Sequence, residues 1–73
     1  MRYRLTIDGM VAVHAKRELF TALAGVPGVI RASVEMGEAE VDCDASVGET
    51  ELRAAIEGHG YSVRAVSKLL PLR

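Results

Sequence analysis

Apolar and polar residues alternate in four short stretches of this chain, at about residues 2–8, 30–36, 38–44 and 61–65. Alternation with a period of two is typical of β-strands that bury one face. A turn at Gly37-Glu38 separates the second stretch from the third, which predicts a β-hairpin. The positions expected to face inward are Tyr3, Leu5, Ile7, Ile30, Ala32, Val34, Met36, Ala39, Val41, Cys43, Tyr61, Val63 and Ala65.

Two helical patterns lie between these strands, at about residues 14–26 and 49–58. Their apolar positions recur every three or four residues, as they do on the buried face of a helix. Pro27-Gly28 ends the first helix, and Gly58 and Gly60 end the second. The two apolar stripes consist of Ala15, Leu19, Ala22, Leu23 and Val26, and of Leu52, Ala55, Ile56 and His59.

The order strand-helix-strand-strand-helix-strand predicts an α+β fold of the ferredoxin-like βαββαβ type. In this fold a four-stranded antiparallel sheet carries both helices on one face. A chain of 73 residues has room for one such domain. We expect the domain to span residues 1–67 and residues 68–73, which include Pro71, to form a C-terminal tail.

No apolar run approaches the roughly 20 residues that a membrane-spanning helix needs. The N-terminal residues run directly into the first strand, without the apolar core of a signal peptide. We therefore expect a cytoplasmic domain without membrane insertion. Arginine outnumbers lysine and alanine is abundant, which hints at a GC-rich bacterial genome.

Charge is unevenly distributed along the chain, although the net charge is only −1. Residues 32–57 carry eight acidic residues and one basic residue, whereas the remainder carries eight basic residues and two acidic ones. This asymmetry predicts an electric dipole that could orient a partner. Solvated surface charge without any partner is the alternative. The chain lacks the basic excess of a nucleic-acid-binding protein, so we expect no nucleic acid as partner.

The single cysteine, Cys43, excludes an internal disulfide and an all-thiolate metal site within one chain. Alternation places this side chain on the inward face of the third strand, where a cysteine acts as a small apolar residue. The acidic neighbours Asp42 and Asp44 should raise the thiol pKa. We therefore interpret Cys43 as structural.

The stretch at residues 5–15 resembles the metal-binding loop of the heavy-metal-associated domains of copper chaperones, mercury-binding proteins and metal-pumping ATPases. The family motif is Gly-Met-x-Cys-x-x-Cys after the first strand, often with His just before the second cysteine. Gly9, Met10 and His14 match the family, while Ala12 and Ala15 stand at the two cysteine positions. The resemblance covers about residues 3–66 and extends to Val26-Pro27-Gly28-Val29, the acidic strand at 40–44, Ala54-Ala55-Ile56-Glu57 and Gly60-Tyr61.

The resemblance implies a module that takes a soft cation, Cu(I) or else Zn(II) or Hg(II), from one partner and passes it to another. Thiolates hold such cations, and an alanine methyl group donates nothing. Only the Met10 thioether and the His14 imidazole remain nearby, so we expect weak metal binding or none. The alanines are engineered replacements, or mark a naturally metal-free member, or leave metal to be held by other groups or between chains.

The resemblance also implies a monomer whose partner is a metal-transporting ATPase or another metal-binding domain. Lys16 and Arg17, beside the loop, are expected to meet that partner. Met10 is expected to pack inward, His59 to lie at the surface, and Tyr61 to shield the loop or pack in the core. A metal-independent interaction or regulatory domain is the alternative function.

An enzyme is not expected. Acylphosphatases share the predicted topology, but their chemistry needs an asparagine, and this chain has none. RNA-recognition domains of the same topology stack bases on aromatic residues of the sheet. Only three aromatic residues occur in the chain, and one of them, Phe20, lies on a predicted helix.

Overall fold

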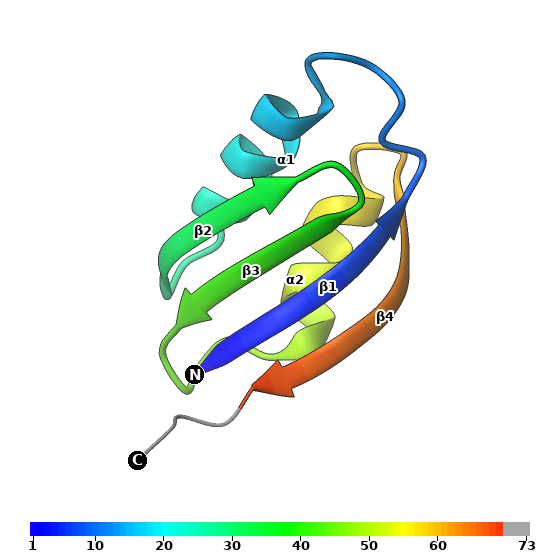
Figure 1. The fold of residues 1–73 in the computed structure, drawn as a ribbon. Coiled ribbons are helices and arrows are strands. Elements are labelled where there is room, and N and C mark those ends of the chain that lie inside the picture. The colour runs from blue at the N-terminus through cyan, green and yellow to red at the C-terminus, as the bar shows by residue number, and fades with distance from the viewer. Residues whose placement is uncertain (70–73) are drawn as a thin grey trace.

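The computed structural model, which describes residues 1–69, has the predicted order of elements (Figure 1). The elements are β1 (Arg2–Asp8), α1 (Ala15–Ala24), β2 (Val29–Glu35), β3 (Glu38–Cys43), α2 (Glu49–Glu57) and β4 (Ser62–Leu69). The strands pair antiparallel in the order β2-β3-β1-β4, and both helices lie against one face of the sheet. The ferredoxin-like βαββαβ fold is therefore confirmed.

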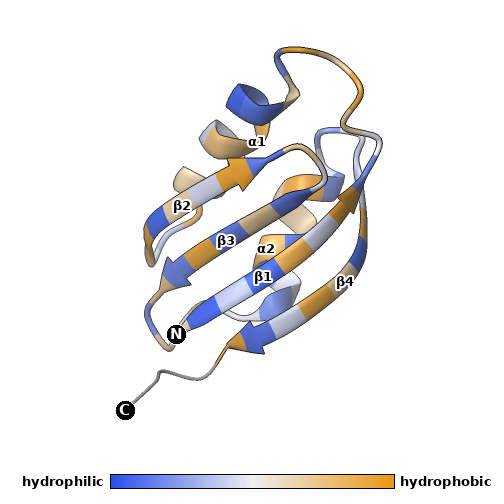
Figure 2. Cartoon of the chain, in the orientation of Figure 1, coloured by the Kyte–Doolittle hydropathy of each residue, from blue (hydrophilic) through white to orange (hydrophobic). Residues whose placement is uncertain are grey.

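The core lies between the helices and the covered face of the sheet. Leu19 and Leu23 of α1 have no exposed surface, and the same holds for Leu52 and Ile56 of α2. Leu5 of β1 is equally buried beneath them. Hydrophilic and hydrophobic residues alternate along the strands, so that the face away from the helices is polar (Figure 2). Full burial of a leucine or isoleucine side chain stabilises the fold by roughly 1.5–3 kcal/mol, which makes these positions the main source of stability.

Two irregularities in strand pairing change which side chains face inward. The register of β2 against β3 shifts between Val29 and Arg31, and Ile30, predicted to be buried, is 75% exposed. The register of β1 against β4 shifts between Thr6 and Ile7, and Ala65 is exposed while Val66 is half-buried. An extra residue in one strand reverses the alternation beyond it, so both inward predictions were wrong.

The hairpin turn also differs from its prediction. Met36 and Gly37 form the turn, whereas Glu38 already belongs to β3. Gly37 has a φ of 85°, a conformation that glycine adopts without steric cost. Met36 is therefore half exposed at the tip of the hairpin instead of facing the core.

The last strand is longer than predicted. It reaches Leu69, so Lys68 and Leu69 belong to the sheet and not to a tail. Residues 70–73, the rest of the predicted tail, lie outside the described residues. Within residues 1–69, no helix combines the length and apolar character required to cross a membrane.

Charges that are far apart in the sequence meet on the polar face of the sheet. Arg2 Nε lies 2.6 Å from an Asp42 carboxylate oxygen, because β1 pairs with β3. Arg4 lies 3.0 Å from Glu38 and 2.8 Å from Glu40. The electric dipole expected from the sequence was based on the distribution of charge along the chain alone. In the folded domain, Arg2 and Arg4 lie next to acidic residues of the segment 32–57.

The neighbouring residues Leu19 and Phe20 give a direct test of the core. Replacing Leu19 with alanine should lower the free energy of unfolding by about 2–5 kcal/mol, because it leaves a cavity in a fully buried site. Phe20 is 48% exposed, so Phe20→Ala is the matched control and should cost about 1 kcal/mol or less. Chemical denaturation measures both values. Equal losses would contradict this placement of α1.

Candidate functional site

The loop that joins β1 to α1, residues 9–14, is held at both ends by buried side chains. Met10 is buried, and its sulfur accepts a hydrogen bond from the Gly37 backbone N–H at 3.1 Å. Ala15, the first residue of α1, has no exposed surface. Met10 thus packs inward, as the sequence predicted, and ties the loop to the hairpin turn.

Between these two anchors the loop is highly exposed. Val11 and Val13 are 91% and 97% exposed, and Ala12 between them is half-buried. His14 is exposed and occupies the N-cap position of α1 without a capping hydrogen bond from its side chain. The loop lies at one end of the molecule (Figure 1). It therefore presents two aliphatic side chains and one imidazole to solvent there.

The two alanines of the motif come together where the loop enters the helix. The Ala15 backbone N–H donates to the Ala12 carbonyl oxygen at 3.1 Å, which places both residues in one turn. Neither methyl group has a lone pair to offer a metal. Within the described part of the chain, no group of three or more His, Cys, Asp or Glu side chains is gathered to hold an ion.

Cys43 cannot supply the missing sulfur. It lies at the opposite end of β1 from the loop, where the Met1 ammonium group donates to its carbonyl oxygen at 2.9 Å. Its side chain is buried in the core, and burial is the main reason that its thiol pKa is raised. The structural interpretation of Cys43 is confirmed.

Tyr61 lies against the beginning of the loop and also joins a polar cluster that the sequence analysis missed. A Cβ added to Gly9 would lie 3.7 Å from Tyr61 Cδ1, so the ring flanks the loop. The Tyr61 hydroxyl donates to Glu18 Oε1 at 2.7 Å, and His59 Nδ1 lies 3.4 Å from Glu18 Oε2. No local spacing signals this cluster, because its contacts join residues 41 and 43 positions apart.

Hydrogen bonding dominates the electrostatics of this cluster. The Tyr61 hydrogen bond is the largest cause of the lowered Glu18 pKa. Burial, the next largest effect, opposes it by raising the pKa, and the His59 hydrogen bond lowers the pKa further. The same bond raises the pKa of Tyr61, because the neutral hydroxyl is the form that donates.

Lys16 and Arg17, the predicted docking residues, are exposed on the first turn of α1 beside the loop. Lys16 Nζ lies 3.3 Å from Glu35 Oε1 at the end of β2. An exposed pair of this kind is worth at most about 1 kcal/mol, so a partner's acidic group can compete for the lysine. The structure thus leaves both cations accessible.

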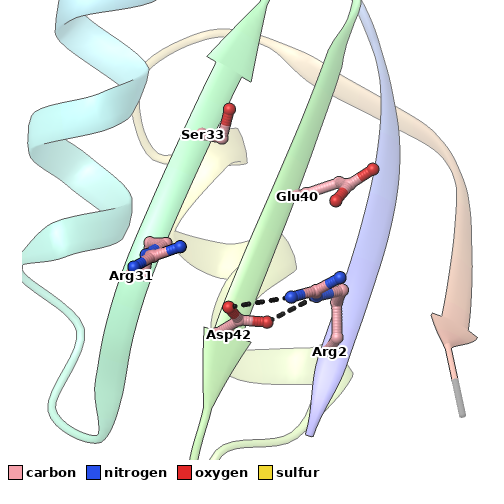
Figure 3. Close-up of a pocket in the computed structure, with 5 residues that line it drawn as sticks. All are labelled: Arg2, Arg31, Ser33, Glu40 and Asp42. Carbon is pink, nitrogen blue, oxygen red and sulfur yellow. Dashed lines mark hydrogen bonds and ion pairs between the residues drawn. The ribbon is translucent and has the colours of Figure 1, made fainter. Parts of the chain in front are cut away.

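A pocket of about 140 Å³ lies on the polar face of the sheet (Figure 3). Its lining consists of Arg2, Arg31, Ser33, Glu40 and Asp42. Arg2 donates a hydrogen bond to Asp42, and this bond is the largest cause of the lowered Asp42 pKa. Arg4 donates a hydrogen bond to Glu40. Both carboxylates of the pocket are therefore paired with arginines of β1.

Replacing Tyr61 with phenylalanine tests the Glu18 cluster. The Glu18 pKa should rise toward its ordinary value of 4.5, as measured by NMR titration of the carboxyl carbon. A carboxyl group with a lowered folded-state pKa stabilises the fold above its unfolded pKa and loses that contribution as the pH falls through the folded pKa. The variant should therefore lose less stability on acidification than the unaltered protein.

The matched control is Tyr3→Phe, since Tyr3 lies in the core and no hydrogen bond joins it to Glu18. This variant should leave the Glu18 pKa unchanged. If Tyr61→Phe also left it unchanged, the hydrogen bond would not be the cause of the shift.

Several solved structures resemble this chain. A CopZ metallochaperone is 33% identical, with 86% of this chain and 98% of that chain covered and a TM-score of 0.81. A copper binding domain from HMA7, a P-type ATPase, is 28% identical over 93% and 100% of the two chains, with a TM-score of 0.81. The N-terminal domain of ZntA in its Zn(II) form is 26% identical over 86% and 88%, with a TM-score of 0.77. Neither a scan of protein-family models nor a search of curated proteins gives a match.

These relatives share the fold of this chain, and between about a quarter and a third of the aligned residues are identical. The CopZ metallochaperone is matched over almost its whole length, so the likeness extends to the complete domain. The loop between β1 and α1 carries Gly9, Met10 and His14 of the family motif at the expected place. The chain belongs to the heavy-metal-associated domain family of metallochaperones and metal-binding domains of transport ATPases.

Proposed function

We propose that this chain is a soft-metal trafficking domain of the Cu(I) type in a form that lacks its metal ligands. The observation that carries the proposal is that Ala12 and Ala15, the residues at the two cysteine positions of the motif, lie in one turn at the start of α1, joined by the 3.1 Å backbone hydrogen bond. Soft cations select thiolate sulfur, and two thiolates at this place would also face the positive end of the helix dipole. Without them, binding of Cu(I), and equally of Hg(II), is weak or absent.

The remaining donors at the loop do not replace two thiolates. The Met10 sulfur is buried and already accepts the Gly37 N–H, and His14 contributes a single imidazole. Zn(II), the other cation of the family's relatives, requires about four ligands and finds one at the loop itself. The loop therefore has the place in the fold that the family's metal loop has, but lacks the donor atoms for a soft cation.

A second function, docking without metal, is favoured by the exposure of Val11 and Val13. Apolar side chains exposed in this way stabilise a complex when a partner covers them. Lys16 and Arg17 beside them suit an acidic surface. The proposed partner is a metal-transporting ATPase or another metal-binding domain, which this non-catalytic, monomeric domain would meet in the cytoplasm.

Restoring cysteine at positions 12 and 15 tests the first function. The variant Ala12→Cys/Ala15→Cys should bind Cu(I) by several orders of magnitude more tightly than the unaltered chain, because it supplies two thiolates at the helix start. Competition with a coloured Cu(I) chelator under reducing conditions measures the affinity. Ala12→Ser/Ala15→Ser is the matched control, similar in size but with oxygen in place of sulfur, and should gain little.

The two outcomes that count against the first function are distinct. Tight Cu(I) binding by the unaltered chain would mean that other groups hold the metal. No gain from the two cysteines, in a variant whose amide spectrum shows the native fold, would mean that the loop is not a metal site.

Titration with a metal-free domain of a P-type ATPase, such as the copper binding domain of HMA7, tests docking. Amide shifts in the ¹⁵N-labelled chain should concentrate at residues 11–17, and Val11→Ser/Val13→Ser should weaken binding by about 1 kcal/mol or more. Ile30→Ser is the matched control, because Ile30 is also exposed but lies at the start of β2, which follows the C-terminal end of α1, whereas the loop precedes its N-terminal end. Equal weakening by both variants, or shifts elsewhere, would contradict docking through the loop.

A further inference from the structure

Glu18 is the centre of a cluster of nitrogen and oxygen donors that contains no sulfur. One of its carboxylate oxygens accepts the Tyr61 hydroxyl at 2.7 Å, and the other lies 3.4 Å from His59 Nδ1. The carboxylate of Glu18 and the imidazole of His59 are 37% and 44% exposed. Two metal-ligating groups from separate elements are therefore already in contact at the surface, within reach of a dissolved ion.

His14 is a third donor on the same side of α1. The Glu18 backbone N–H donates to the His14 carbonyl oxygen at 3.0 Å, so the two residues are one helical turn apart. Residues spaced by four lie on one face of a helix. His14 is also exposed, so its imidazole is accessible to a dissolved ion.

We propose that His14, Glu18 and His59 form a binding site for a borderline divalent cation of the Zn(II) or Cu(II) class. Imidazole nitrogen and carboxylate oxygen are the donors that such cations accept, whereas Cu(I) prefers sulfur. The site is distinct from the cysteine positions of the motif, because none of its three donors stands at residue 12 or 15. Water completes the coordination at a surface of this kind.

The site closes by movement of one side chain. Among residues 1–69 no three ligand side chains are gathered to hold an ion, but two of the three proposed donors already touch. His14 is exposed and makes no capping hydrogen bond, so its imidazole can rotate toward Glu18 at little cost. The Tyr61 hydroxyl holds one Glu18 oxygen and so leaves the other directed to His59, as outer partners of metal ligands commonly do.

This site does not depend on the proposed function. A chain that binds no Cu(I) at its loop can still bind Zn(II) through imidazole and carboxylate, and the reverse also holds. Measurements with Zn(II) on the unaltered chain therefore test the cluster separately from the cysteine variants.

Zn(II) titrated into the unaltered protein, followed by calorimetry, should show one site. His14→Gln, Glu18→Gln and His59→Gln should each weaken Zn(II) binding at least about tenfold, or about 1.4 kcal/mol. Glu49→Gln is the matched control, since Glu49 is an exposed helical glutamate that pairs with Arg53 at the start of α2. It should bind Zn(II) as the unaltered chain does.

The imidazole ring nitrogens of the unaltered protein give a readout that needs no substitution. On addition of Zn(II), the ¹⁵N resonances of His14 and His59 should shift together with the same midpoint. A shift of one histidine alone would overturn the proposal, because it would indicate a solitary imidazole contact. The absence of a stoichiometric complex, or equal affinity in Glu18→Gln and Glu49→Gln, would overturn it as well.

Discussion

Burial of one sheet face beneath two helices is the constraint from which the rest of this structure follows. Leu19 and Leu23 leave α1 no freedom to shift along the sheet, because both are fully buried in a close-packed core. Because α1 is held in place, the position of Ala15 in its first turn is fixed. The loop must then connect the end of β1 to Ala15. The hydrogen bond from the Gly37 N–H to the Met10 sulfur fixes the other end of the loop. Contacts with the core thus fix both ends of the loop.

The division between scaffold and ligands explains why the fold of this domain needs no thiols at residues 12 and 15. Residues 12 and 15, at the family's cysteine positions, lie where the loop enters α1, and Leu19, Leu23, Leu52 and Ile56 of the core lie deeper in the two helices. Replacing sulfur by a methyl group changes which cations the loop accepts, because softness and lone pairs belong to the donor atom. Function in such a domain resides in a few side chains placed on a stable framework.

Charge on the surface acts locally in this domain. Arg2 and Arg4 pair with acids of β3 across the sheet, and Lys16 pairs with Glu35. Exposed pairs of this type contribute little to stability, so they matter more for solubility and for the potential that a partner meets. At the loop, the apolar tips of Val11 and Val13 stand beside cations, an arrangement that combines contact area with electrostatic steering.

The sequence by itself determined the order of the elements, the core positions on both helices, the place of the loop and the absence of thiols from it. Each of these depends on spacing within one element or on the chemistry of single residues. Only the tertiary structure decided that bulges expose Ile30 and Ala65, and that Glu18 meets His59 and Tyr61. A bulge depends on how two strands pair, and the Glu18 contacts join residues 41 and 43 positions apart. Local periodicity carries no information about such distances, because only packing brings those segments together.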